Sequence, residues 1–305
     1  MKNLDLTAAP WRDYELLDSG DNKKLERFGA VVLIRPETQA IWRPAHPELW
    51  KQAKMEFRFD GGKGSWRGKG APEKWDISWN DDARCTLRLT SFKHIGIFPE
   101  QAPNWEWIAE RVDALGRREE GEEGRKDKGR PDVLNLFGYT GIASIVAAKH
   151  GARVTQCDAS KQSNAWAKEN AALSDVPPDS IRYITDDALK FVEREARRGS
   201  VYDGIILDPP AFGRGPDGEV WKIEDDICKL LDTVKKLLAQ KPGSFFLLNG
   251  YAAGYAPQSL LQSVESSFPE IAGAKKIAGE FGELQIGEKA SGRAVPSGIY
   301  VRFVL

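Results

Sequence analysis

Cysteine and histidine are both scarce in this chain of 305 residues, with three of each. Cys85, Cys157 and Cys228 lie far apart, form no CxxC pair and cannot all pair with one another. This usage is typical of a reducing compartment, and it provides neither a disulfide framework nor a zinc motif. With so few histidines as well, we expect no metal site.

Long apolar runs and an excess of charge are also missing. The first residues lack the apolar core of a secretory signal, and no run approaches the roughly 20 apolar residues of a membrane span. The formal net charge of −1 argues against a protein wrapped in nucleic acid, although a local basic patch is compatible with it. We therefore expect a soluble, cytoplasmic protein.

A charged segment divides the chain. Residues 116–132, GRREEGEEGRKDKGRPD, are almost wholly charged residues and glycine, which is typical of a solvated linker. Short apolar and alternating runs before it indicate a small β-rich domain. The predicted organisation is a β-rich domain for substrate recognition over 1–99, a helix and charged linker over 100–131, and a second domain over 132–305.

Strand-like and helix-like segments alternate in the second domain. The strand candidates are VLNLFG, ARVTQCD, IRYITDD, YDGIILDPP and GSFFLLNG, and several have the continuous apolar character of strands buried on both faces. This alternation predicts an α/β, Rossmann-like, doubly wound parallel sheet. Two further strand candidates near the C-terminus have no helix between them, which indicates an antiparallel edge.

The first strand leads into a glycine-containing turn. Gly138 and Gly141 let the backbone turn tightly and approach a ligand, and Asp158 ends the second strand, where a carboxylate can accept hydrogen bonds from a ribose diol. Two alternatives need no ligand: a plain tight connection at the glycines, and Asp158 as the N-cap of a helix near Lys161. The spacing lacks the G-x-G-x-x-G of dinucleotide sites.

Acidic residues also end the third and fourth strands. Asp187, after Asp186, can accept from an adenine amino group or cap the next helix. Asp208 is followed by Pro209 and Pro210, which fix an extended backbone and leave nearby carbonyl groups free to accept hydrogen bonds. An acidic group with such carbonyls can orient an N–H or O–H nucleophile, although the segment can also be purely structural.

Together these motifs resemble those of class I S-adenosylmethionine-dependent methyltransferases. More narrowly, LNLFGYTG, LDPPAFGRG and KHIGIFPEQAPNW resemble the bacterial large-subunit ribosomal RNA methyltransferase family that includes 5-methylcytosine and 7-methylguanine enzymes. The resemblance extends from about Ser91 to the C-terminus. It implies S-adenosylmethionine as cofactor and a seven-stranded sheet whose last strand is antiparallel.

The resemblance also implies roles for individual residues. The turn would hold the methionine part of the cofactor, Asp158 the ribose and Asp187 the adenine, while Asp208, Pro209 and Pro210 would face the methyl group as catalytic residues. Glu100 matches an acidic residue next to the cofactor, or it serves as a carboxylate at a helix N-terminus. The implied cofactor residues are Glu100, Asn135, Phe137, Gly138, Tyr139, Thr140, Gly141, Asp158, Ala159, Asp187, Ala188 and Asp208.

The expected chemistry is methyl transfer without a cysteine nucleophile. A sulfonium methyl is already activated, so catalysis is mostly positioning, whereas methylation at carbon 5 of a pyrimidine needs a thiolate. No cysteine lies near Asn249, and we expect Cys157 and Cys228 to be buried. The predicted acceptor is a nitrogen or oxygen of RNA, with ribosomal RNA as the expected substrate. Alternatives are a protein or small-molecule acceptor, or a non-catalytic nucleotide-binding module.

Two segments are candidates for holding RNA. The loop after the two prolines could stack an extruded base, or its tryptophan could cover the core. The predicted substrate residues are Phe212, Arg214, Trp221, Lys222 and Asn249. Residues 50–75 interleave basic and aromatic side chains, which indicates either an RNA surface or an ordinary solvated hairpin. The sequence leaves the oligomeric state open, including a homodimer.

Overall fold

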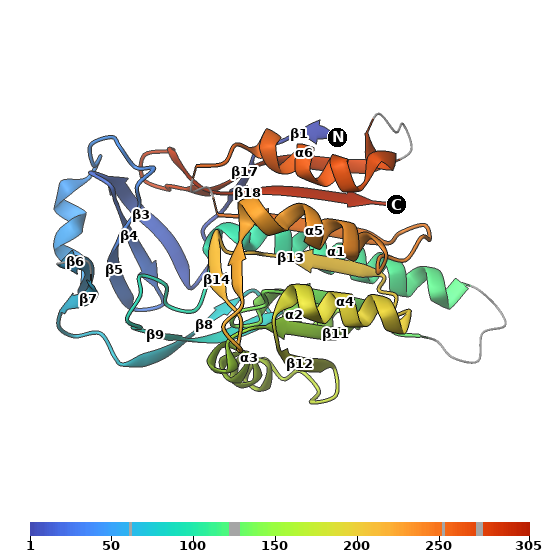
Figure 1. The fold of residues 1–305 in the computed structure, drawn as a ribbon. Helices are drawn as coiled ribbons and strands as arrows, with labels where there is room; N and C mark the ends of the chain where they lie inside the picture. Colours follow the sequence, from blue (N-terminus) through green and yellow to red (C-terminus); the bar gives the residue numbers. More distant parts are fainter. Residues whose placement is uncertain (61–62, 122–128, 252–253, 273–276) are drawn as a thin grey trace. The chain divides into compact units, whose positions relative to one another are not determined.

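The computed structural model describes residues 1–60, 63–121, 129–251, 254–272 and 277–305, with the side chains of residues 118–121 excepted. The chain forms two compact units (Figure 1). Unit 1 consists of Met1–Asp5, Asn104–Glu283 and Gly298–Leu305, and unit 2 consists of Leu6–Pro103 and Leu284–Ser297. Each unit therefore takes residues from both predicted domains. Residues 122–128 of the predicted linker lie outside the described residues.

A largely parallel sheet is the centre of unit 1. Its order is β12-β11-β10-β13-β16-β18-β17-β1, and β2 also pairs with β17. The first five strands run parallel, and β18 runs antiparallel to β16. The described residues give nine strands rather than the seven implied by the resemblance, because the short β1 and β2 add to the edge. The bounds are β1 (Lys2–Asn3), β2 (Leu6–Ala8), β10 (Asp132–Leu136), β11 (Arg153–Asp158), β12 (Ile181–Thr185), β13 (Gly204–Leu207), β16 (Phe245–Gly250), β17 (Ala278–Gly287) and β18 (Ala294–Val304).

Helices cover both faces of this sheet, which explains why β13 is buried along its whole length. Successive residues of a strand point to opposite faces. The ring of Phe246 lies 5.1 Å from that of Phe268, which follows α6, whereas the ring of Phe245 lies 5.5 Å from Trp107 of α1. Figure 1 shows α4, α5 and α6 in front of the sheet and α1 behind it. The helices are α1 (Ala102–Gly121), α2 (Ile142–Lys149), α3 (Lys161–Leu173), α4 (Ala188–Arg198), α5 (Ile223–Lys235), α6 (Pro257–Ser267) and the short η3 (Pro269–Ile271).

Unit 2 is built mainly of antiparallel strands, which confirms the β-rich N-terminal region. A five-stranded sheet has the order β3-β4-β5-β6-β7, and β8 and β9 form a separate hairpin. The elements are β3 (Tyr14–Gly20), β4 (Lys23–Phe28), β5 (Val31–Pro36), η1 (Pro47–Gln52), β6 (Met55–Asp60), β7 (Lys63–Gly68), β8 (Lys74–Trp79), β9 (Ala83–Arg88) and η2 (Pro99–Gln101).

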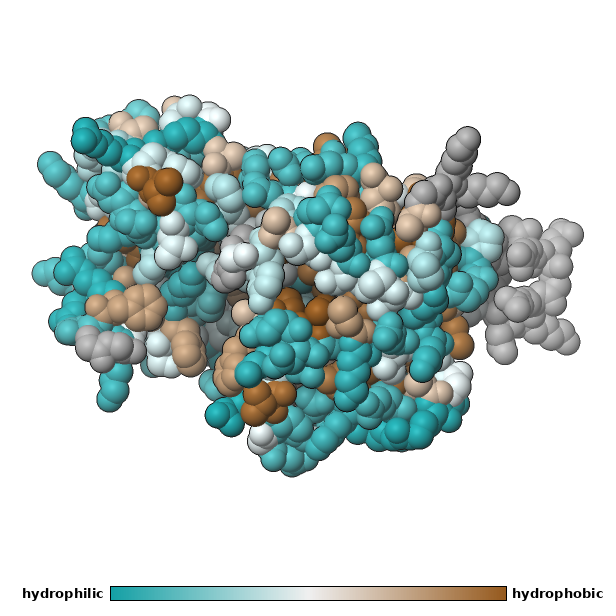
Figure 2. Space-filling view, turned by 45° about the horizontal axis from the view of Figure 1, so that its top comes forward, coloured by the Kyte–Doolittle hydropathy of each residue, from teal (hydrophilic) through white to brown (hydrophobic). Residues whose placement is uncertain are grey.

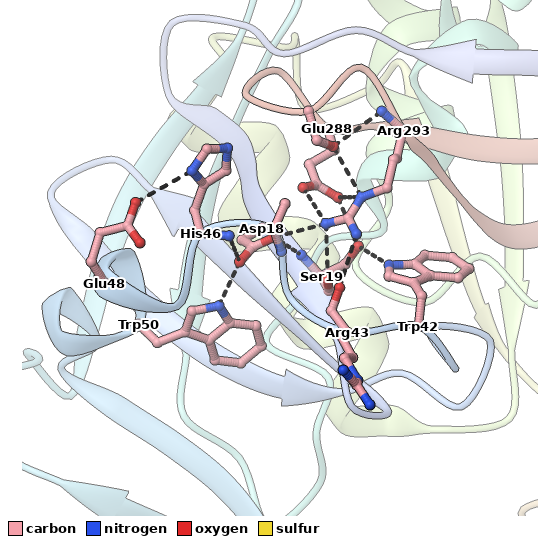
Figure 3. A network of polar contacts seen from close by, with 11 residues as sticks. Asp18, Ser19, Trp42, Arg43, His46, Glu48, Trp50, Glu288 and Arg293 are labelled. Carbon is pink, nitrogen blue, oxygen red and sulfur yellow. Dashed lines mark hydrogen bonds and ion pairs between the residues drawn. The ribbon is translucent and has the colours of Figure 1, made fainter.

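A network around Arg293 joins the two segments of unit 2 (Figure 3). Its guanidinium donates to Asp18 Oδ1 at 2.8 Å and to Glu288 Oε1 at 2.7 Å, and both carboxylates are buried. Asp18 also accepts hydrogen bonds from the indole of Trp50 and the backbone N–H of His46. Burial alone would raise the pKa of Asp18, but these hydrogen bonds outweigh it and lower the pKa. The network thus fixes residues 284–297 against β3.

No helix among the described residues is both long and apolar enough to cross a membrane.

Candidate functional site

The predicted cofactor residues of unit 1 lie along one edge of the sheet. The adjacent strands β12, β11, β10 and β13 run parallel, so their carboxyl ends meet at this edge, where α/β sheets bind ligands. Leu136 is paired with both Cys157 and Leu207, which brings the segments after all three residues side by side. The motifs predicted from the sequence thus lie at the ends of neighbouring strands.

The turn after β10 has an unusual backbone. Phe137, Tyr139 and Gly141 have φ angles of 59°, 46° and 85°, in the left-handed region that residues other than glycine rarely adopt. Such strain persists where surrounding contacts enforce it, and it is common at ligand sites. Here the backbone N–H of Tyr139 donates to Asp158 Oδ2 at 2.8 Å, and that of Gly141 to the carbonyl of Gly138 at 2.9 Å. The side chain of Asp158 therefore helps to hold the turn in place.

Gln156 packs against the turn, a role that the sequence did not predict. A Cβ atom on Gly138 would lie 2.4 Å from Gln156 Cγ, so only glycine fits there. The amide Nε2 of the fully buried Gln156 donates to the carbonyl of Tyr139 at 3.3 Å and to Asn164 Oδ1 at 3.2 Å. Its Oε1 accepts no hydrogen bond in the described part of the chain. Gln156 is one of several polar residues in the strand segment RVTQCD, so the sequence offered no distinctive signal for its role.

Buried side chains complete the base of the turn. Asn135 donates to Ser144 Oγ at 2.8 Å, and the carbonyl of Thr140 accepts from Asn170 Nδ2 at 2.9 Å. Gly141 begins α2, and a Cβ atom there would lie 2.8 Å from that of Ala167. The turn is thus packed against two helices as well as the sheet.

Asp158 uses both carboxylate oxygens. Besides the bond from Tyr139, its Oδ1 accepts from the backbone N–H of Ser160 at 2.8 Å. Ser160, not Asp158, caps α3, since its hydroxyl accepts from the N–H of Ser163 at 3.0 Å, so the N-cap alternative for Asp158 is wrong. Burial raises the pKa of Asp158, and the two backbone hydrogen bonds only partly oppose it. Ala159, which directly follows Asp158, is half-buried.

Asp187 caps α4, as its structural alternative predicted. Its Oδ1 accepts from the backbone N–H of Lys190 at 3.0 Å, and Ala188 is the buried first residue of the helix. Asp186 forms an ion pair with Arg194. The cap engages one oxygen of Asp187, which is compatible with a second contact from its other oxygen.

The segment after β13 lies beside the turn. The backbone N–H of Asp208 donates to the carbonyl of Leu136 at 3.3 Å, directly before the turn, and Pro209 is buried whereas Pro210 is exposed. The carbonyl of Pro210 accepts from the indole of Trp221 at 2.7 Å. This corrects the expectation that the carbonyls here are all free.

Trp221 belongs to the core. It is 4% exposed, and its ring lies 5.1 Å from that of Phe137. The prediction that it stacks a base is therefore corrected, and the alternative of a core-covering tryptophan holds. It lies on β15 (Val220–Lys222), which pairs with β14 (Phe212–Arg214).

The β14–β15 hairpin exposes the side chains of its first and last residues to solvent. Phe212 is 54% exposed, and the guanidinium of Arg214 lies 5.9 Å from the centre of its ring. Lys222 is exposed, with its ammonium 3.5 Å from the carboxylate of Asp225. The hairpin therefore presents one aromatic ring and two cations to solvent.

Two other predicted residues lie in different surroundings. Asn249 is 4% exposed and its Oδ1 accepts from Asn104 Nδ2 at 2.8 Å, and its contact with the substrate stays a prediction. Glu100 belongs to unit 2, in η2 directly before α1, and is buried. Burial raises the pKa of Glu100, although the positive charges of Lys24 and Arg35 oppose the change.

The cysteines differ in exposure. Cys157 is buried, and burial raises its pKa far above the usual range. Cys85 is also buried, whereas Cys228 is exposed, which corrects the expectation that it is buried. No group of three or more histidine, cysteine or acidic side chains among the described residues is arranged to hold a metal ion.

Comparisons with curated proteins find methyltransferases of larger size. No family model matches the chain. Ribosomal RNA large subunit methyltransferase K/L of Shewanella sp. (strain ANA-3) is 41% identical over 119 residues, which is 38% of this chain and 16% of that protein. The protein of the same name from Pseudoalteromonas atlantica is 32% identical over 223 residues, 72% of this chain and 28% of that protein. The chain thus spans less than a third of the length of these relatives.

Solved structures match nearly the whole chain. A putative methyltransferase from Streptococcus mutans, 18% identical, shows likeness of fold alone, with a TM-score of 0.71 over 96% of this chain and 75% of that chain. The S-adenosylmethionine-dependent methyltransferase from Agrobacterium tumefaciens is 37% identical and has a TM-score of 0.86, over 99% of this chain and 93% of that chain. This chain therefore belongs to the S-adenosylmethionine-dependent methyltransferases.

Proposed function

We propose that this enzyme transfers the methyl group of S-adenosylmethionine to a nitrogen or oxygen atom of an RNA base, with ribosomal RNA as its acceptor. One observation carries the proposal: the Asp208 segment and the strained turn lie side by side, joined by the Asp208 N–H bond to Leu136. A group that orients an acceptor thus adjoins the turn proposed to hold the cofactor. The names of the curated relatives support RNA as the acceptor.

The residues of the turn fit the cofactor. Gly138 and Gly141 let the turn pack directly against Gln156 and Ala167, and Gln156 Oε1 is a buried acceptor without a partner in the described residues. We infer that residues 135–141 hold the methionine part. Asp158 retains lone pairs for the ribose hydroxyls, and Asp187 has one oxygen beyond its helix cap for the adenine amine.

The finer fold and domain assignments are part of the same proposal. The strands β12, β11, β10, β13, β16, β18 and β17, in sheet order, would be the seven of the class I methyltransferase sheet. Among them β18, the last along the chain, would be the antiparallel strand. Unit 2, which contains most of residues 1–99, would recognise the substrate. A homodimer stays a prediction, which sedimentation of the purified chain would test.

The chemistry needs positioning more than acid or base catalysis. When bound, the cofactor would supply an already activated methyl group on a positively charged sulfur. Asp208 would accept a hydrogen bond from an N–H or O–H group of the acceptor and align it. Correct alignment alone is worth up to roughly 7–11 kcal/mol in ideal cases. Cys157 is excluded as a nucleophile by its burial and its raised pKa.

Exposed aromatic and basic groups provide surfaces for RNA. In unit 1 these are Phe212, Arg214 and Lys222 of the β14–β15 hairpin. In unit 2, Phe59 of β6 is 66% exposed, and the half-buried Trp66 of β7 is paired with the buried Phe57. Stacking on such rings and charge contacts with phosphates are the usual means of binding single-stranded RNA. Trp66 donates to the carbonyl of Thr90 and is held within unit 2.

The test is transfer of a radioactive methyl group to RNA. Purified enzyme, S-adenosylmethionine labelled in its methyl group and protein-free large-subunit ribosomal RNA should give label that ribonuclease releases, and digestion to nucleosides should place it on a nitrogen or oxygen. Asp208→Asn, a nearly isosteric change, should lower the rate by about tenfold or more while cofactor binding persists. Label that resists ribonuclease and remains on protein, or label on a base carbon, would contradict the proposal.

A further inference from the structure

A cavity of about 200 Å³ lies between α5 and α6 in unit 1. Ile227, Leu260 and Ile299 give it an apolar lining, and Tyr251 and Tyr255, each 37% exposed, stand at its rim. On the face shown in Figure 2, apolar side chains form small separate patches within a largely hydrophilic surface. A half-open apolar pocket with partly exposed aromatic rings is typical of a small-ligand site.

The cavity lies next to the proposed methyl-transfer edge. Ile223 lines it, and the backbone N–H of Ile223 donates to the carbonyl of Ala211 at 3.1 Å, three residues after Asp208. Gly250, another lining residue, is the last residue of β16. Leu248, two residues earlier on the same strand, is paired with Leu207 of β13. The cavity and Asp208 therefore belong to the same edge of the sheet, on neighbouring strands.

The size and lining of the cavity suit a flat heteroaromatic ring. An apolar cavity of about 150 Å³ holds benzene, so the present one accommodates a somewhat larger ring system but not a whole nucleotide. Tyrosine rings stack on bases. Glu224, whose carboxylate lies 3.3 Å from the hydroxyl of Tyr255, and the hydroxyl groups of Ser259 and Ser263 supply polar partners for the edge of a base. A lipid chain would use none of these groups.

We propose that this cavity receives a base of the RNA substrate that adjoins the methylated base. The inference rests on the proposed function, because it takes the occupant to be part of the same RNA. The ring of Tyr251 or Tyr255 stacks on the base, and Glu224 accepts from its N–H groups. The sugar and phosphate stay outside, because the cavity has room only for a ring system.

Cys228 makes the proposal testable. It lines the cavity and is the exposed one of the three cysteines, all of which the structure describes. Alkylation of Cys228 by iodoacetamide, followed by mass spectrometry, should slow by about fivefold or more in saturating AMP, GMP, CMP or UMP, at least one of which should protect. Ribose 5-phosphate, which lacks the base, should not protect. Tyr251→Ala or Tyr255→Ala should weaken protection by about fivefold or more, whereas Tyr255→Phe, which keeps the ring, should retain most of it.

A second measurement guards against indirect effects on the thiol. The same nucleotides should shift the methyl signals of Ile223, Ile227 and Ile299 in isoleucine-labelled enzyme, and leave that of the distant Ile145 unchanged. If no nucleotide protects Cys228 or shifts these methyls, or if ribose 5-phosphate acts equally, the inference is wrong. RNA methylation without protection overturns the inference alone, whereas protection without methylation of RNA overturns the proposed function.

Discussion

Gly138→Ala tests whether close packing beneath the turn determines cofactor binding. The new Cβ atom would lie 2.4 Å from Gln156 Cγ and 2.5 Å from its Cδ, closer than carbon atoms can approach. Gln156 is completely buried, so it has little space in which to move. We expect it to shift and to lose its hydrogen bonds to the Tyr139 carbonyl and to Asn164.

The expected cost follows from these contacts. Overpacking a well-packed site costs about 1–3 kcal/mol, and leaving a buried polar group unsatisfied costs a further ~1–3 kcal/mol. The free energy of unfolding of unit 1 should therefore fall by about 2–6 kcal/mol. At ~2–4 °C per kcal/mol for a unit of this size, the melting temperature should drop by roughly 4–24 °C. Affinity for S-adenosylmethionine should fall as well, because the turn is displaced.

Thermal unfolding and calorimetric titration of S-adenosylmethionine measure both effects. Adding Gln156→Ala to Gly138→Ala removes the clashing side chain, so the double variant should be less destabilised than the sum of the two single variants. Gly116→Ala is a matched control: no atom lies within 4 Å of the new Cβ, and alanine favours a helix over glycine by about 0.5–1 kcal/mol. A Gly138→Ala enzyme with normal stability and affinity, or strictly additive losses, would refute the reasoning.

Other predictions concern single residues. Asp158→Ala should lower affinity for S-adenosylmethionine by about tenfold or more in calorimetry, because the turn loses an acceptor and the cofactor loses its proposed ribose contact; unchanged affinity would contradict the assignment. Arg293→Ala should destabilise unit 2 by about 3–5 kcal/mol in urea unfolding, because it strips the charge partner from the buried carboxylates of Asp18 and Glu288; a loss below ~1 kcal/mol would show that the network is dispensable. Because the pKa of Asp18 is lowered by folding, its stabilisation is present above the usual aspartate pKa of ~3.9 and is lost as the pH falls through the lower folded value. Urea unfolding of Asp18→Asn should accordingly be less dependent on pH below that point than unfolding of the natural chain. Cys228→Ala should lower the rate of RNA methylation by no more than about tenfold, the cost of altering the lining of the proposed base pocket, whereas a loss near a thousandfold would indicate a cysteine nucleophile.

Local pattern predicted much of unit 1 correctly. Alternating strands and helices with continuous apolar runs determine a parallel sheet, and parallel strands bring their carboxyl ends to one edge. The proximity of the turn, Asp158 and the Asp208 segment follows from that rule alone. The turn's glycines were recognisable because close backbone approach excludes other residues.

The errors concern residues whose partners are distant in sequence. Trp221 reads equally well as an exposed stacking ring and as a core residue until the ring of Phe137 is seen beside it. The supporting role of Gln156 likewise depends on a turn that precedes it in the sequence. The surroundings of a polar side chain are set by tertiary packing, which sequence periodicity does not encode.

The discontinuity of unit 2 affects how the protein is made. A ribosome synthesises β3 to β9 early, but the segment that carries Arg293 and Glu288 emerges only after nearly all of unit 1. Until then the buried carboxylate of Asp18 lacks its arginine, and closing such a long loop is entropically costly and slow. We therefore expect the nascent unit 2 to stay incompletely folded, and dependent on chaperones, until residues 284–297 have been synthesised.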